Sequence, residues 1–317
     1  MSPRERLLIV FAAVGAVLLG ATVLVAVMKG RQPDRDLREL ELRVRTWWLM
    51  IGVFFGALLW DDRAALGLWA LICFLALKEF LSLVPFRHQA RRLMFWCYLA
   101  IPLQFVWVSM AWYLLFIIFI PVYLFLALPV RAVMLGHTED YVRTVATLQW
   151  GVMLLVFCLS HAAFLLVLPE HVNPVGGGAG LLVFLVVLTQ LNDVLQYVWG
   201  KSIGNRKVAP SVSPGKTWGG LIGGVLSTTV VAGLLAPFLT SFSGWEGWGA
   251  GFVIGVAGFA GDVNLSALKR DIGVKDSGSL LPGHGGLLDR VDSLTFTAPL
   301  FFHYTVYLHK MFPELGG

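Results

Sequence analysis

Residues 95–130 read FWCYLAIPLQFVWVSMAWYLLFIIFIPVYLFLALPV, and none of their side chains is charged. A transmembrane helix needs about 20 apolar residues to cross roughly 30 Å of hydrocarbon. This stretch is therefore too long for one crossing and is predicted to form two helices, over 95–111 and 113–130, punctuated by Pro102 and Pro121. Its continuous apolar character favours helices, because the strands of a membrane barrel alternate between apolar and polar residues.

The rest of the chain has the same character. Of its 317 residues 57% are apolar and only 14% are charged, and the mean hydropathy is +0.77, which excludes a soluble protein. We predict an all-α, polytopic membrane protein with about ten spans. These spans are residues 7–28, 46–60, 64–84, 95–111, 113–130, 147–168, 180–199, 219–240, 247–268 and 292–311. Nine spans remain the alternative, because the second is short and the fourth and fifth divide one stretch.

Basic residues gather in alternate loops, which indicates the cytoplasmic side of a membrane protein. The loops concerned are 29–45, 85–92, 131–146, 200–218 and 269–291. The other loops are nearly free of lysine and arginine, although Arg4, Arg6 and Arg63 depart from the pattern. We therefore expect both termini outside and the two long C-terminal loops in the cytoplasm, with the bacterial inner membrane as the location.

Composition also limits the functional classes. The three cysteines lie inside apolar runs without a CxxC pair, so neither a disulfide framework nor a zinc site is indicated. No continuous basic run or basic helix suggests a nucleic-acid partner. We divide the chain into N-terminal transmembrane helices, 1–170, and a C-terminal transmembrane catalytic region with cytoplasmic motif loops, 171–317.

Almost all clusters of polar residues lie between residues 190 and 292, and they form three groups. The first contains Gln190, Asn192 and Asp193, and the second is the loop from Ser211 to Gly220. The third runs from Asp262 to Asp292. Because an ionisable group at membrane depth costs roughly 2.5 kcal/mol or more unless it is paired or hydrated, such clusters indicate function.

The third group carries residues suited to a metal-bound phosphate. Asp262, Ser266 and Lys269 stand at i, i+4 and i+7, so a continuing helix would place them on one face. Asp289 and Asp292 share a second face. Carboxylates at the cytoplasmic ends of two neighbouring helices could hold Mg²⁺, and nearby glycines would let backbone N–H groups approach a phosphate. Pairing of the carboxylates with neighbouring lysines and arginines alone is the alternative.

The run from Ser266 to Asp292 resembles, over its 27 positions, the signature of the phosphatidate cytidylyltransferase (CDP-diacylglycerol synthase) family. The stretch Ser213-Pro-x-Lys216-Thr217-Trp218 is similar to the second motif of that family. Asn192-Asp193, with Tyr197, Gly200 and Gly204, is similar to the first motif. The resemblance covers residues 190–292, about a third of the chain.

The resemblance implies transfer of cytidylyl from CTP to phosphatidic acid or a related lipid phosphate, which gives CDP-diacylglycerol and pyrophosphate. It implies that Mg²⁺ or another divalent cation is held by Asp262 and Asp289. The implied catalytic residues are Asp262, Ser266, Lys269, Arg270 and Asp289. The implied substrate-binding residues are Asn192, Asp193, Ser213, Lys216, Thr217, Lys275, Asp276, His284, Gly285, Gly286, Arg290 and Asp292. The expected partners are CTP, the lipid phosphate and membrane lipids, and a homodimer is allowed.

One position departs from the family pattern. Gly219 stands where an acidic residue usually follows the second motif, which leaves room for a divergent paralogue with another lipid acceptor. Two other functions stay open: a CTP-dependent lipid kinase, which would transfer the γ-phosphoryl group to an alcohol, and a non-enzymatic transporter. Against the transporter, the charged residues are expected at helix ends and no inverted repeat is visible.

Overall fold

The computed structural model describes residues 1–31, 36–86, 91–136, 139–278, 280–283 and 285–310, and most of them are helical. The long helices are α1 (Pro3–Arg31), α2 (Arg38–Trp60), α3 (Asp62–Leu83), α4 (Arg91–Ser109), α9 (Gly177–Ser202), α10 (Trp218–Leu239) and α11 (Trp245–Ile272). Two further rods are composite: α5, η2 and α6 (Tyr113–Ile118, Phe119–Leu124, Phe125–Met134), and α7, η3, α8 and η4 (Tyr141–Val152, Met153–Cys158, Leu159–Phe164, Leu165–Val167). The shorter elements are η5 (Glu170–Val172), α12 (Leu288–Val291) and α13 (Leu294–Leu308).

The helical membrane fold is confirmed. Nine helices in the described part of the chain are long and apolar enough to cross a membrane. The tenth predicted span corresponds to α13, whose 15 residues reach about 22 Å at 1.5 Å per residue. The predicted division of residues 95–130 is also confirmed, because the chain turns at Ala111, which has a φ of 51°.

Several predicted boundaries lie a few residues from the observed ones; the sixth span, for example, was expected to begin at residue 147, but its first helix α7 begins at Tyr141. The second span was expected to begin at residue 46, but α2 begins at Arg38, because its charged first turns continue the helix beyond the apolar part. The last span was expected to begin at residue 292, but α13 begins at Leu294, after a turn at Asp292 and Ser293. The η2 segment around Pro121 is π-helical, as is typical where a proline removes a backbone hydrogen bond.

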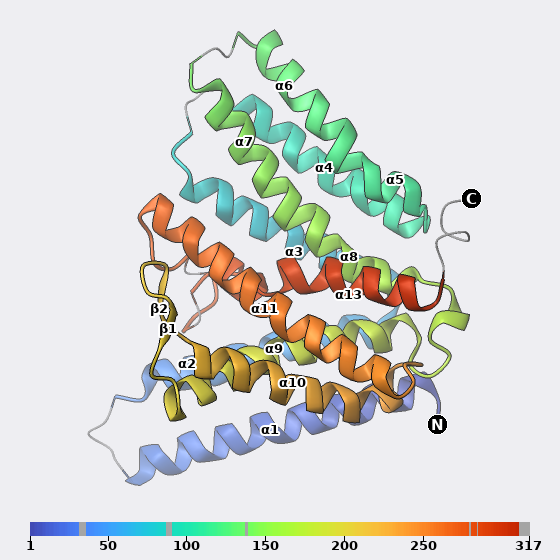
Figure 1. Cartoon of the computed structure of the whole chain (residues 1–317), viewed down its shortest axis with the longest axis vertical. Coiled ribbons are helices and arrows are strands. Elements are labelled where there is room, and N and C mark those ends of the chain that lie inside the picture. Colours follow the sequence, from blue (N-terminus) through green and yellow to red (C-terminus); the bar gives the residue numbers. More distant parts are fainter. Residues whose placement is uncertain (32–35, 87–90, 137–138, 279, 284, 311–317) are drawn as a thin grey trace.

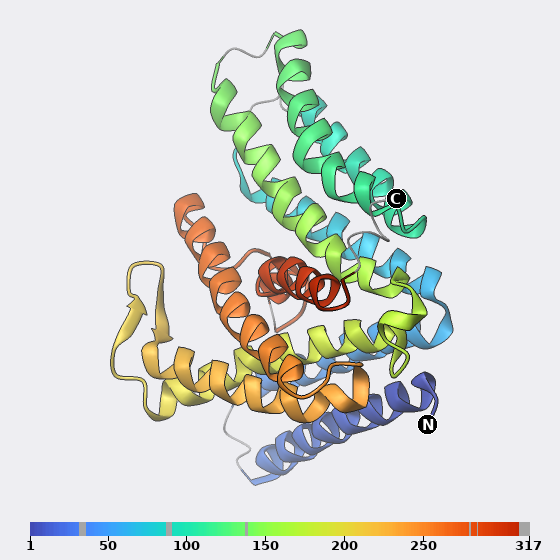
Figure 2. The same cartoon turned by 45° about the vertical axis from the view of Figure 1, so that its right-hand side comes forward.

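Helix α13 lies at the centre of the bundle. It packs against α8, α9 and α11, and Figures 1 and 2 show it surrounded by longer helices. Phe301 and Phe302 on α13 are fully buried, and their ring centroids lie 5.7 Å from Phe184 and 5.3 Å from Phe164. This aromatic layer fixes α13, and with it the turn that carries Asp292.

Small residues bring α10 and α11 close together. A β-carbon added to Gly251 would collide with Ala232 and the backbone of Thr229, and one added to Gly255 would lie 3.1 Å from the Val225 backbone. Close approach through small residues is the usual packing mode of membrane helices, since lipid provides no hydrophobic force between them. The α9, α10 and α11 helices therefore form a closely packed frame for the polar residues they carry.

The one hairpin among the described residues interrupts the all-α fold. Strands β1 (Lys207–Ala209) and β2 (Ser213–Thr217) pair antiparallel between α9 and α10. Thr217 then starts α10, because its hydroxyl accepts a hydrogen bond from the N–H of Gly220 at 3.1 Å. In Figure 1 this hairpin, the start of α2 and the end of α11 lie on one side, opposite the start of α1 and the end of α13.

The arrangement leads to a prediction about sidedness. We expect the side with the hairpin to face the cytoplasm, because its loops are the basic ones. Cysteines introduced at exposed Arg206 and Lys275 should react with an impermeant maleimide only after cells are permeabilised. A cysteine at exposed Trp245, on the opposite side, should react in intact cells. Labelling of Lys275→Cys in intact cells would contradict the topology.

Candidate active site

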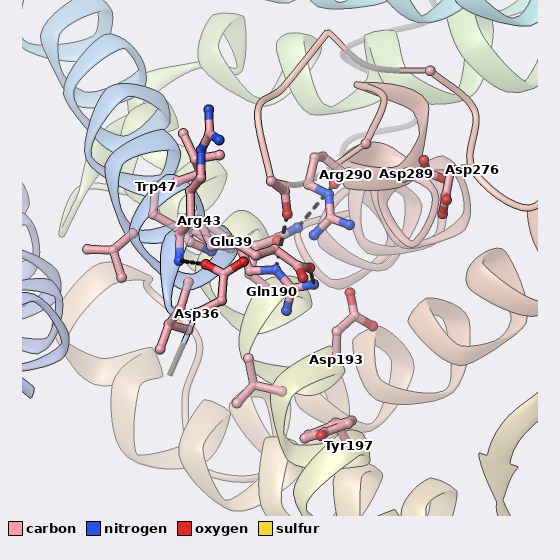
Figure 3. Close-up of a pocket in the computed structure, with 18 residues that line it drawn as sticks. Asp36, Glu39, Arg43, Trp47, Gln190, Asp193, Tyr197, Asp276, Asp289 and Arg290 are labelled. Atoms are coloured by element: carbon pink, nitrogen blue, oxygen red, sulfur yellow. Dashed lines mark hydrogen bonds and ion pairs between the residues drawn. The ribbon is translucent and has the colours of Figure 1, made fainter. Parts of the chain in front are cut away.

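A polar cavity of about 1040 Å³ opens between α2, α9 and the loop that follows α11. Figure 3 shows Gln190, Asp193 and Tyr197 of α9 along one wall, with α2 on another side. Arg290 extends between them, and Asp276 and Asp289 lie at the far edge. The first and third polar groups of the sequence thus meet at one cavity.

The second polar group meets the other two where Lys216 contacts Asp262 and Gln196. The Lys216 ammonium on β2 lies 2.6 Å from Asp262 Oδ2 on α11 and donates to Gln196 Oε1 on α9 at 3.1 Å. Asp193 on α9 and Asp292 before α13 act electrostatically on each other and on Asp262. Three carboxylates from three segments therefore act electrostatically on one ammonium group, and Asp262 contacts it directly.

This cluster lies deeper than the sequence suggested. We expected the charged residues at helix ends, but Asp193 stands nine residues before the end of α9 and Asp262 ten before the end of α11. That distance is roughly 14 Å along a helix axis. The helices continue past the apolar segments used to predict their ends, so the carboxylates are recessed. Partial burial strengthens their mutual repulsion and their attraction to Lys216.

Lys216 and Asp292 lie outside the membrane spans, and their pKa values reflect burial and the neighbouring carboxylates. Burial alone would lower the pKa of Lys216, but the negative charges of Asp262 and Asp193 outweigh it and raise that pKa. Burial raises the pKa of Asp292 well above its usual value, and the charges of Asp262 and Asp193 add to the effect. The cluster therefore attracts positive charge.

A second pair forms beside the first. The Lys269 ammonium lies 2.5 Å from Asp289 Oδ1. Asp289 Oδ2 accepts from the N–H and hydroxyl of Ser277 at 3.0 and 2.9 Å, and from the N–H of Gly286 at 3.3 Å. Burial would raise the pKa of Asp289, but these donors together with Lys269 lower it. Asp289 is therefore held as a carboxylate.

Several predicted site residues have structural partners. Asn192 is fully buried and bridges three helices, since its amide donates to Gly255 O at 3.1 Å and accepts from Thr228 at 3.1 Å. Arg270 donates to Val212 O and Val274 O, which links α11 to the hairpin loop. Ser266 donates to Asp262 at 3.2 Å.

The remaining predicted residues are divided between two pockets and an exposed turn. Ser213 and Thr217 line a smaller pocket together with Lys216. Lys275 is exposed in the turn after α11, and Asp276 and Gly285 line the main cavity. His284 lies outside the described residues.

Gly219, the departure from the family pattern, has a close neighbour. A β-carbon at this position would lie 3.1 Å from Ile203 O and 3.3 Å from the Cα of Gly204. This is tighter than ordinary van der Waals contact, so a glutamate here would require the turn after α9 to move. The chain is therefore packed for glycine at this position.

Sequence reasoning missed the contribution of the N-terminal helices. Arg43 and Thr46 on α2 donate to the carbonyls of Gly283 and Pro282 at 3.1 and 2.8 Å. Glu79 on α3 accepts from the N–H of Leu287 at 2.8 Å and from the hydroxyl of Ser277. The signal was present, because Glu79 and its neighbour Lys78 are ionisable residues within a mostly apolar predicted span, and such residues usually have a specific partner.

An apolar pocket of about 290 Å³ adjoins the polar cavity between α2 and α3. Trp47, Gln190 and Arg290 line both spaces. The Nε of Arg290 is buried and makes no hydrogen bond within the described part of the chain. The junction therefore presents a guanidinium between a polar and an apolar space.

Similarity to known proteins identifies the family of this chain. Residues 41–308 match the sequence profile of the cytidylyltransferase family. The chain is 46% identical over 292 residues to the uncharacterized protein YnbB of Escherichia coli, covering 92% of this chain and 96% of that protein.

It is also similar to two proteins named phosphatidate cytidylyltransferase. With that of Haemophilus influenzae it shares 42% identity over 40% of this chain and 46% of the relative, and with that of Synechocystis 41% over 43% and 47%. These two alignments span about half of each relative. Because the family profile covers most of the sequence, the chain belongs to the cytidylyltransferase family, a family of nucleotidyltransferases.

Proposed function

We propose that this protein transfers cytidylyl from CTP to phosphatidic acid or a closely related lipid phosphate, at the cytoplasmic side of the bacterial inner membrane. One observation carries the proposal: a polar cavity lined by motif residues adjoins an apolar pocket, and Arg290 lies between them. A nucleotide triphosphate requires the first space and an acyl chain the second. A water-soluble acceptor would have no use for the pocket.

The reaction joins two anions. An oxygen of the lipid phosphate forms a bond to the α-phosphorus of CTP, while the bond from that phosphorus to the oxygen bridging the β-phosphate breaks. Pyrophosphate leaves with the bonding electrons. Because the attacking phosphate is already ionised near neutral pH, no strong general base is needed. The protein must chiefly align the reactants and offset their negative charge.

The chain supplies that charge from two lysines. Lys216 and Lys269 come from different segments, and each is held by a carboxylate, Asp262 and Asp289 respectively. The pairing keeps each ammonium group in place before substrates arrive. When CTP binds, its phosphates would compete with the carboxylates for the same two cations.

The carboxylates near Lys216 are the type of ligand that a divalent cation would use. Asp193, Asp262 and Asp292 offer the carboxylate oxygens that Mg²⁺ prefers, and a cation would relieve the repulsion between them. When bound, Mg²⁺ would neutralise charge on the triphosphate. Among the described residues no three acidic, histidine or cysteine side chains lie in an arrangement that could hold a metal ion, so binding would require the carboxylates to move together. A shared ion between Asp262 and Asp289 stays a prediction, since donors already occupy both Asp289 oxygens.

The apolar pocket suits an acyl chain of the acceptor. Its walls include Ile51, Phe54, Ile72 and Leu75 from α2 and α3, and Leu281 from the motif loop. At its polar end lies the guanidinium of Arg290, whose Nε makes no hydrogen bond within the described part of the chain. This guanidinium would bind the lipid phosphate. We infer that the lipid head group lies beside Arg290 with its chain between α2 and α3.

The first test of the proposal is product analysis. Purified protein in lipid nanodiscs, with labelled CTP and Mg²⁺, should convert phosphatidic acid into CDP-lipid and pyrophosphate. A lipid kinase would instead convert diacylglycerol into a phospholipid and release CDP. Formation of CDP without pyrophosphate would reject the cytidylyltransferase assignment.

The second test concerns the two lysines. Lys216→Met and Lys269→Met should each lower turnover by more than about tenfold, because a cation facing the phosphates is lost. Exposed Lys29, paired with Glu41 at 2.6 Å, provides the control variant Lys29→Met, which should retain activity. Size-exclusion profiles would confirm folded protein in all three. Full turnover in both test variants would show that these cations only set topology.

The third test concerns the acyl chain. Ile72→Trp should fill the pocket and raise KM for a long-chain acceptor by roughly tenfold, while a short-chain lipid phosphate should be affected much less. Leu114→Trp places the same side chain on an exposed face of α5 outside the pocket and serves as the control. Equal effects of Ile72→Trp on both acceptors would place the chain elsewhere.

A further inference from the structure

Glu79 is the acidic residue within α3 that contacts the motif loop. We propose that Glu79 is a positioning residue for this loop: it fixes Ser277 and Leu287 and, through Ser277, orients the Asp289 carboxylate that holds Lys269. The expected effect of Glu79 on turnover rests on the proposed function, which gives Asp289 and Lys269 a role in the reaction. The contacts of Glu79 with Ser277 and Leu287 do not depend on that function.

The two carboxylate oxygens of Glu79 bind the two ends of one loop. Oε2 accepts from the backbone N–H of Leu287 at 2.8 Å, and Oε1 accepts from the hydroxyl of Ser277. These two donors are ten positions apart in the sequence. One side chain from the N-terminal half therefore closes the loop, and hydrogen bonds to a carboxylate are about twice as strong as neutral ones.

The loop is shaped to admit this side chain. A β-carbon at Gly286 would overlap Glu79 Oε1 and the Ser277 hydroxyl, and one at Gly278 would lie 3.2 Å from the Glu79 carboxyl carbon. The Glu79 carboxylate thus lies against the loop backbone at two glycines, and a side chain at either position would have to displace it. Ser277 is 2% exposed, so water provides little alternative for its hydroxyl.

Ser277 connects Glu79 to Asp289. Its oxygen lies 2.9 Å from Asp289 Oδ2, but a hydroxyl has one hydrogen and can donate to one carboxylate at a time. The Ser277 N–H also donates to Asp289 Oδ2, at 3.0 Å. When the hydroxyl donates to Glu79, this N–H still fixes Asp289. Glu79 therefore acts on the Asp289–Lys269 pair by holding Ser277 in place.

The test measures the loop directly and does not depend on activity. Hydrogen–deuterium exchange of the full chain in nanodiscs should show about tenfold faster exchange in peptides covering 276–290 for Glu79→Gln, because an amide cannot accept from both donors. Exposed Glu41 supplies the matched control Glu41→Gln, which removes one charge on the same side of the protein. Unchanged exchange in Glu79→Gln would overturn the proposal.

Two further variants separate position from charge and from general stability. Glu79→Asp keeps the charge but is one methylene shorter, so it should exchange as fast as Glu79→Gln. If Glu79→Asp exchanged at the wild-type rate, the negative charge at this position would be sufficient, and the exact position of the carboxylate would not matter. Glu79→Gln should have an unfolding temperature close to that of Glu41→Gln. A clearly lower unfolding temperature in Glu79→Gln would show that Glu79 stabilises the whole protein and does not specifically position the loop.

Turnover provides the link to the reaction. Glu79→Gln and Ser277→Ala should each lower kcat by about tenfold, and the double variant should fall little further, because both act on the same chain of contacts. Losses that multiply in the double variant would show that Glu79 does not act through Ser277. If the wild-type protein makes no CDP-lipid, the proposed function fails, while the exchange experiment still tests the role of Glu79.

Discussion

The site depends on one constraint: charged groups recessed among membrane helices must be paired. Asp193 and Asp262 lie about two or three turns inside largely apolar membrane helices, where an unpaired charge is costly. Lys216 reaches Asp262 because the hairpin folds back over the end of α9, and Lys269 reaches Asp289 because the loop after α11 returns to the bundle. The same pairs that make the buried charges tolerable also hold two cations at the cavity.

The frame that supports these pairs is itself ordinary membrane-helix packing. Small residues on α10 and α11 allow close approach, and the aromatic layer fixes α13 at the centre. Asn192 joins α9, α10 and α11 through its two hydrogen bonds. Asn192, which is part of the first motif, is therefore buried and holds the helices together. A position in a family motif does not by itself mean contact with a substrate.

The N-terminal half matters more to the site than its weak resemblance to the family suggested. Helix α2 forms a wall of the polar cavity and holds the loop at Pro282 and Gly283, while α3 supplies Glu79. Helices α2 and α3 also form the sides of the apolar pocket. The division at residue 170 therefore describes a difference in sequence character, and both parts contribute side chains to one site.

The sequence by itself determined the membrane class, the helices and their order, because apolar length and continuity are local properties that tertiary contacts do not alter. It also indicated which segment carries the chemistry, since polar residues are rare in this chain. Only the tertiary structure decided the pairing: Asp262 meets Lys216, Lys269 meets Asp289, and Glu79 reaches Ser277 across 198 positions. Spacing along one helix placed Asp262 near Lys269, but a side chain chooses its partner among all the segments packed around it, and that choice depends on how α3, α9, α11 and the hairpin are arranged in space.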